Sequence, residues 1–93
     1  MNEVLRIIVR GRVQGVGYRF FAEDAARKEG VTGWVRNLPG GGVEVLARVN
    51  SASKPRFLAA LRNGPPTARV ENLNIEMLHD DDACPEGEFI IKY

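Results

Sequence analysis

The 93-residue sequence is poor in the residues from which disulfides and metal centres are built. It contains one cysteine, Cys84, and one histidine, His79. One thiol excludes an internal disulfide, and the two residues together exclude a multi-thiolate or histidine-rich metal site. The acidic run Asp80-Asp81-Asp82 lacks the alternating ligand spacing of a calcium loop. We therefore expect no metal, and we interpret His79 as a surface residue and Cys84 as an incidental residue of an exposed loop without a basic neighbour.

The sequence also lacks a charge excess and a long apolar run. Its 13 lysines and arginines balance 12 aspartates and glutamates, whereas a non-specific nucleic-acid binder normally carries a clear basic excess. No apolar stretch is long enough to cross a bilayer, and the N-terminal segment has no secretion signal. Hydrophobic residues make up 44% of the chain, which suffices for one core. We expect a single cytoplasmic domain over residues 1–93, a monomer without nucleic-acid or membrane partners.

Hydrophobic patterning predicts a β-α-β-β-α-β order followed by a short extra strand. The expected strands cover residues 4–10, 31–37, 43–49, 69–77 and 89–91, and the expected helices run from residue 19 or 20 to 29 and from about residue 53 to 63. This order is typical of the ferredoxin-like sandwich, an α+β fold in which two helices cover one face of an antiparallel sheet. Its first and third strands are usually central and its second strand flanks the third. The end of the second strand can therefore approach the loop that follows the first.

That loop, Gly11-Arg12-Val13-Gln14-Gly15-Val16-Gly17-Tyr18-Arg19, is rich in glycine and leads into a helix. Closely spaced glycines let successive backbone N–H groups turn inward as an anion-binding nest, and the helix dipole adds partial positive charge. The guanidinium of Arg19 can grip two phosphate oxygens. The alternative is a tight connection whose arginine only faces solvent. The glycine spacing fits neither the P-loop nor the dinucleotide-binding pattern.

Asn37 is the second candidate, at the end of the second predicted strand. An amide beside the glycine-rich turn Leu38-Pro39-Gly40-Gly41-Gly42 is more often a turn former than a catalytic group. Its side chain nevertheless offers both a donor and an acceptor, which is enough to hold a water molecule without becoming charged.

Three segments together resemble the acylphosphatase family: Gly11–Arg19, Gly33-Trp34-Val35-Arg36-Asn37 and Gly42-Val43-Glu44-Val45. The resemblance implies a ferredoxin-like fold and hydrolysis of the carboxyl–phosphate bond of acyl phosphates, without a cofactor. It implies that Arg19 is the phosphate-binding catalytic arginine and that Asn37 orients the attacking water. The phosphate would lie against the backbone of a group of consecutive residues, Gln14, Gly15, Val16, Gly17, Tyr18 and Arg19.

The sequence departs from the family pattern at three positions. Gly40 replaces an acidic residue, Gly42 often replaces a longer side chain, and Tyr18 stands where phenylalanine is commoner. Three consecutive glycines predict a looser turn beside Asn37. The ring of Tyr18 can still pack with its hydroxyl at the edge of the core.

The implied chemistry suits a sequence with so few reactive side chains. The leaving group is a carboxylate whose conjugate acid has a pKa of about 4, so no general acid is needed. Phosphoryl transfer depends mainly on positioning and charge stabilisation. Three alternatives are a non-catalytic anion sensor, an RNA-binding module, and a domain of a larger carbamoyl-transfer maturation protein. The RNA-binding module is disfavoured because the strand over residues 43–49 has no aromatic residue.

Overall fold

The structure, a computed structural model, describes residues 2–78 and 84–93. The interpretations of His79 and of Asp80-Asp81-Asp82 lie outside these residues. The elements follow the predicted order: β1 (Glu3–Arg12), α1 (Tyr18–Glu29), β2 (Thr32–Asn37), β3 (Val43–Val49), α2 (Ser53–Asn63), β4 (Arg69–Leu78) and β5 (Phe89–Ile91). The bounds of β3 and β5 agree with the prediction residue for residue, whereas β1 extends two residues further at its end. No helix among the described residues is long and apolar enough to span a membrane.

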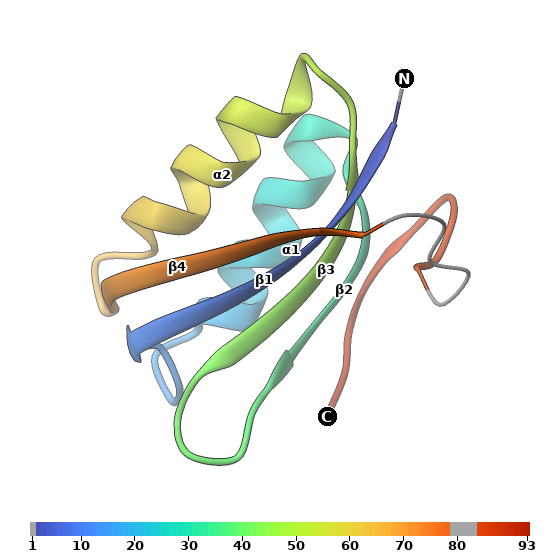
Figure 1. The fold of residues 1–93 in the computed structure, drawn as a ribbon. Helices are drawn as coiled ribbons and strands as arrows, with labels where there is room; N and C mark the ends of the chain where they lie inside the picture. The colour runs from blue at the N-terminus through green and yellow to red at the C-terminus, as the bar shows by residue number, and fades with distance from the viewer. Residues whose placement is uncertain (1, 79–83) are drawn as a thin grey trace.

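The strands form one five-stranded sheet in the order β4-β1-β3-β2-β5. The first four strands pair antiparallel as predicted, and β5 adds to β2 in parallel. Figure 1 shows both helices on one face of the sheet, which confirms the ferredoxin-like sandwich. Val43 of β3 is opposite Val9 of β1 on one side and opposite Asn37 of β2 on the other. The loop after β1 and the turn after β2 therefore leave the sheet at the same end.

The main core lies between the sheet and the two helices. Fully buried Leu5, Ile7 and Val45 from the sheet pack with Phe57 and Leu61 from α2. Burying side chains of this size stabilises the fold by roughly 1.5–3 kcal/mol each. Small α1 residues allow this helix to approach the sheet closely; they are Ala22, Ala25 and Ala26.

Both helices have recognisable boundary signals. α1 ends at Gly30 in the left-handed conformation, whose N–H bonds back to the last turn, and basic residues lie in that turn as the dipole favours. At the start of α2, the side-chain oxygen of Asn50 accepts hydrogen bonds from the N–H groups of Ala52 and Ser53, at 2.9 and 2.8 Å. Asn50 thereby satisfies donors that the helix itself leaves unpaired.

Tyr18 begins α1 with its side chain in the main core rather than at its edge. The residue is 1% exposed, and its hydroxyl donates a 2.7 Å hydrogen bond to the carbonyl oxygen of Leu61. Leu61 lies in the last turn of α2, where backbone carbonyl groups have no N–H partner within the helix. Tyr18 therefore links the two helices through one buried hydrogen bond.

The open face of the sheet carries a buried carboxylate. Glu44 of β3 is 2% exposed and forms ion pairs with Arg6 of β1 and Arg36 of β2, the latter at 2.6 Å. Each arginine side chain is about half exposed, so water screens part of the attraction. The three residues connect the three central strands on the side of the sheet away from the helices.

Cys84 corrects one expectation. It lies not on an exposed loop but in a small buried cluster with Val4, Trp34 and Leu46, and it is 3% exposed. A basic neighbour is also present, because Arg48 donates a 3.2 Å hydrogen bond to the Cys84 carbonyl oxygen. The open sheet face has an apolar cluster that needs a cover, and the return segment before β5 provides it.

We predict that Tyr18→Phe lowers the free energy of unfolding by about 1–2 kcal/mol, because the Leu61 carbonyl loses its buried donor. Burial also raises the pKa of the Tyr18 hydroxyl above its ordinary value of 10.0. The folded state then retains a proton that the unfolded state releases, so wild-type stability should fall as the pH rises above 10. Urea unfolding at pH 8 and pH 10.5 should show a smaller fall for the variant; equal falls would contradict the assignment.

We predict that Glu44→Gln lowers the free energy of unfolding by about 1–3 kcal/mol, because two arginines lose their carboxylate while water still reaches them. Urea unfolding measures the change. Glu71→Gln is the matched control: Glu71 is exposed on β4 and forms no ion pair with any described residue, so its replacement should change stability by less than about 0.5 kcal/mol. Similar effects of both substitutions would show that the pairs contribute nothing specific.

Candidate functional site

The loop between β1 and α1 presents a row of backbone donors. Gly15 and Gly17 adopt positive φ angles of 73° and 80°, which side-chain-bearing residues rarely adopt. Within the described residues, the backbone N–H groups of residues 14–19 donate no hydrogen bond to the protein. The first turn of α1 also contains no acidic side chain that would compete for the helix N-terminus. Unpaired N–H groups at the positive end of a helix dipole form a site for an anion.

Two side chains of this loop are committed to the core and leave only their backbone groups for a ligand. The side chain of Tyr18 is in the main core and that of Val16 packs against it. Thr67, in the connection before β4, donates a 2.7 Å hydrogen bond to the carbonyl oxygen of Val16. That contact orients the Val16 peptide from outside the loop and was not apparent in the sequence, because Thr67 lies 51 residues away.

Arg19 lies in the first turn of α1, and its side chain reaches the C-terminal segment. Its Nη1 donates a 2.9 Å hydrogen bond to the Lys92 carbonyl oxygen, and its guanidinium lies 4.6 Å from the centroid of the Tyr93 ring. Lys92 in turn donates its N–H to the Val35 carbonyl oxygen at 2.8 Å, two residues before Asn37. The guanidinium is thereby placed beside the end of β2. Most of its five N–H donors have no partner among the described residues.

Asn37 is the last residue of β2, at the same end of the sheet. Its side-chain oxygen Oδ1 is buried and accepts no hydrogen bond from the described part of the chain. A buried acceptor without a donor is unfavourable by about 1–3 kcal/mol. Such an atom therefore has a strong preference for a donor supplied from outside the protein.

Gln14 connects the loop to the turn that follows Asn37. Its side-chain nitrogen Nε2 donates hydrogen bonds to the carbonyl oxygens of Leu38 and Gly42, at 2.8 and 2.7 Å. The sequence placed Gln14 in the loop through its backbone, and its side-chain contacts were not predicted. Gln14, Arg19 and Asn37, which are up to 23 residues apart in sequence, thus gather around one end of the sheet, where Figure 1 shows the loop, the turn and the C-terminus.

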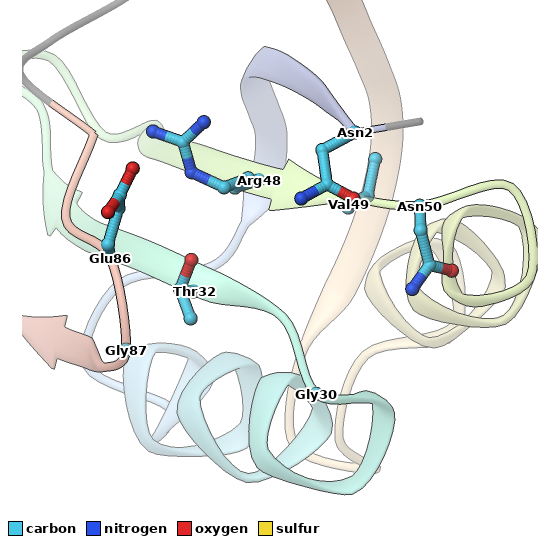
Figure 2. Close-up of a pocket in the computed structure, with 8 residues that line it drawn as sticks. All are labelled: Asn2, Gly30, Thr32, Arg48, Val49, Asn50, Glu86 and Gly87. Carbon is cyan, nitrogen blue, oxygen red and sulfur yellow. The ribbon is translucent and has the colours of Figure 1, made fainter.

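A separate polar pocket of about 400 Å³ lies at the opposite end of the sheet. Figure 2 shows its lining, which includes Thr32, Arg48, Asn50 and Glu86 and none of the candidate site residues. The Arg48 guanidinium and the Glu86 carboxylate balance each other in this lining, so the pocket has no net positive charge to attract an anion. Across the described residues, no three histidine, cysteine, aspartate or glutamate side chains gather closely enough to hold a metal ion.

Comparison with known proteins identifies the family. Residues 5–91 match the acylphosphatase family model. An acylphosphatase of Koribacter versatilis is 46% identical over 85 residues, which are 91% of this chain and 73% of that protein. The crystal structure of acylphosphatase from Bacillus subtilis has a TM-score of 0.90 at 36% identity and covers 100% of both chains. The phosphate- and nucleotide-bound full-length HypF shares the fold, with a TM-score of 0.86 at 21% identity over 12% of its chain. This chain belongs to the acylphosphatase family, enzymes that hydrolyse acyl phosphates.

Proposed function

We propose that the backbone N–H groups of residues 14–19 and the guanidinium of Arg19 hold the phosphoryl group, while Asn37 orients the attacking water. The observation that carries this proposal is the buried, unpartnered Oδ1 of Asn37 at the same end of the sheet as the unpaired loop amides. The side-chain oxygen of Asn37 needs a hydrogen-bond donor, and the loop N–H groups favour an anion. A water molecule and a phosphoryl group satisfy both at once.

The phosphate half of the site works through fixed dipoles and one charge. The loop N–H groups converge through the left-handed glycines, and α1 adds its dipole. The hydrogen bond to Lys92 and the contact with Tyr93 hold the Arg19 guanidinium without using its remaining N–H groups. These donors need no reorganisation as charge shifts during the reaction, and such preorganisation is often the largest contribution to catalysis.

The water half works through one neutral amide. A water that donates one hydrogen to Asn37 Oδ1 keeps a lone pair free for attack on phosphorus. Because the amide carries no charge, it adds no repulsion toward the anionic phosphoryl group. Holding two reacting groups in fixed geometry can lower a barrier by about 7–11 kcal/mol, so positioning alone can supply much of the rate acceleration.

The bond changes require no further catalytic group. The water oxygen forms a bond to phosphorus as the bond between phosphorus and the acyl oxygen breaks. The carboxylate leaves with the bonding electron pair and needs no proton, because its conjugate acid has a pKa of about 4. The proton lost by water remains on the phosphate product or passes to solvent. The transition state is loose, and its charge lies largely on the phosphoryl oxygens between the attacking and leaving groups. The loop and Arg19 stabilise that charge.

The proposed site contacts the phosphoryl group and makes almost no contact with the acyl group. We therefore extend the proposal to broad specificity among small acyl phosphates. We also propose that residues 1–93 act as one domain and as a cytoplasmic monomer on such substrates. A single main core that includes residues from Leu5 to Phe89 supports the one-domain proposal.

We predict that Asn37→Ala lowers kcat for benzoyl phosphate about 100- to 1000-fold, the loss seen when one preorganised polar group is removed from an active site. Inhibition by inorganic phosphate should persist, because Asn37 does not hold phosphate. Arg19→Ala should lower kcat/KM similarly and also weaken phosphate inhibition. Initial rates, corrected for uncatalysed hydrolysis, measure both changes.

Two matched controls accompany these variants. Arg27→Ala removes an arginine from the other end of α1, and Asn74→Ala removes an exposed asparagine from β4. Both should keep wild-type rates. Full activity in a folded Asn37→Ala variant would refute the proposed role of the amide, and unchanged phosphate inhibition in Arg19→Ala would refute the role of the guanidinium.

We predict little or no hydrolysis of alkyl phosphate monoesters. These substrates expel an alkoxide, which requires a general acid, a nucleophile or a metal, and the proposed site includes none of them. Rates with glycerol phosphate and benzoyl phosphate should differ by several orders of magnitude under identical conditions. Comparable turnover of the two substrates would contradict the proposed division of roles.

A further inference from the structure

Gln14 is unusual among the loop residues because its side chain joins both halves of the site. Both of its contacts run from Nε2, to the carbonyl oxygens of Leu38 and Gly42 at 2.8 and 2.7 Å. A side-chain amide nitrogen has two N–H donors, so both are used. The facing carbonyl oxygens also fix the orientation of the amide, since the reversed orientation would place oxygen against oxygen.

The two acceptors belong to the turn between β2 and β3. The Leu38 N–H donates to the Gly42 carbonyl oxygen at 2.8 Å, and the Gly41 N–H donates to the Leu38 carbonyl oxygen at 3.3 Å. Gln14 adds a third and a fourth hydrogen bond to these same carbonyl groups. Ordering three consecutive glycines is entropically costly, and the turn has few side chains with which to hold itself. Support from the neighbouring loop replaces that missing internal support.

The position of Leu38 makes this support relevant to catalysis. Leu38 follows Asn37 directly, so the Leu38–Pro39 peptide whose carbonyl oxygen Gln14 binds lies one residue beyond the residue proposed to orient water. Gln14 itself is the first residue of the proposed phosphate loop. Its side chain therefore connects the loop proposed to hold the phosphoryl group with the turn beside the residue proposed to hold the water. A displacement of about 1 Å between reacting groups can lower a rate 100-fold.

We propose that Gln14 is a positioning residue that fixes the turn bearing Asn37 relative to the phosphate loop. It acts through Asn37 and not on the phosphoryl group with its side chain. This inference rests on the roles proposed above for Arg19 and Asn37. It also explains how a turn made mostly of glycine can support an accurately placed catalytic amide.

The test compares Gln14→Met with wild type, because methionine has a similar length and no donor. We expect kcat for benzoyl phosphate to fall about 10- to 100-fold. The inhibition constant for inorganic phosphate should change less than about threefold, because the backbone N–H groups and Arg19 remain. Amide hydrogen exchange of Leu38 and Gly41 should also become faster. Unchanged kcat or unchanged exchange in this variant would overturn the proposal.

Thr67→Val is the matched control. Thr67 also anchors the phosphate loop, through the Val16 carbonyl oxygen, but it has no contact with the turn. Its replacement should affect phosphate inhibition more than kcat and should leave exchange of Leu38 and Gly41 unchanged. If Thr67→Val and Gln14→Met give the same pattern, Gln14 serves only to stabilise the loop, and the proposed coupling is wrong.

A double-mutant cycle separates positioning from a merely structural role. Adding Gln14→Met to Asn37→Ala should cause no further loss of kcat, because the residue through which Gln14 acts is already absent. Additive losses would refute the coupling. If Asn37→Ala alone leaves kcat unchanged, the proposed function fails before Gln14 is tested, so the two failures are distinguishable.

Gln14→Glu provides a second variant should Gln14→Met fold poorly. An ionised glutamate places an oxygen without a proton against two carbonyl oxygens, whereas a protonated glutamate restores one O–H donor. We expect the ratio of its kcat to the wild-type kcat to rise as the pH falls through about 5 toward 4. A ratio independent of pH would show that donation to the turn has no part in catalysis.

Discussion

The antiparallel register of β1, β3 and β2 is the constraint on which the whole site depends. It places Val9, Val43 and Asn37 in one row across the sheet, so that the loop and the turn emerge together. A slip of two residues between β2 and β3 would preserve the buried faces but move Asn37 by about 7 Å along the strand. Glu44 opposes such slips, because its carboxylate on β3 is bound by an arginine from each neighbouring strand.

The proposed site uses different parts of the polypeptide for its two tasks. Phosphate binding is assigned to main-chain N–H groups and one guanidinium, and placement of water to one uncharged amide. This combination suits a substrate whose leaving group departs unaided. The proposed chemistry needs no thiol, which agrees with the position of the only cysteine in a small apolar cluster on the open face of the sheet. The fold contributes accurate placement rather than reactive side chains.

Local patterns in the sequence predicted the elements, because periodicity and turn residues encode them. The approach of Asn37 to the loop was predicted from the usual strand order of the fold that those elements indicated. These patterns did not predict the parallel addition of β5, the burial of Cys84 or the contact of Arg19 with Lys92. Each of these depends on a return of the chain across the sheet, and the last joins residues 73 positions apart. The side chain of Gln14 belongs to the same class: a loop glutamine has many possible partners, and only the assembled sheet selects the Leu38 and Gly42 carbonyl groups.

The left-handed glycines of the loop have an evolutionary consequence. The donors of the proposed phosphate site are mostly backbone N–H groups, so substitutions at loop positions other than Gly15, Gly17 and Arg19 leave them in place. The proposed water site, in contrast, depends on the side chain of Asn37 and on the support that Gln14 gives to the turn beside it. Under these proposed roles, substitution of Asn37 would remove turnover and leave phosphate recognition in place, whereas substitution of Arg19 would weaken both. On the proposed roles, a single substitution at Asn37 separates this enzyme from a protein that still binds phosphate without hydrolysing acyl phosphates.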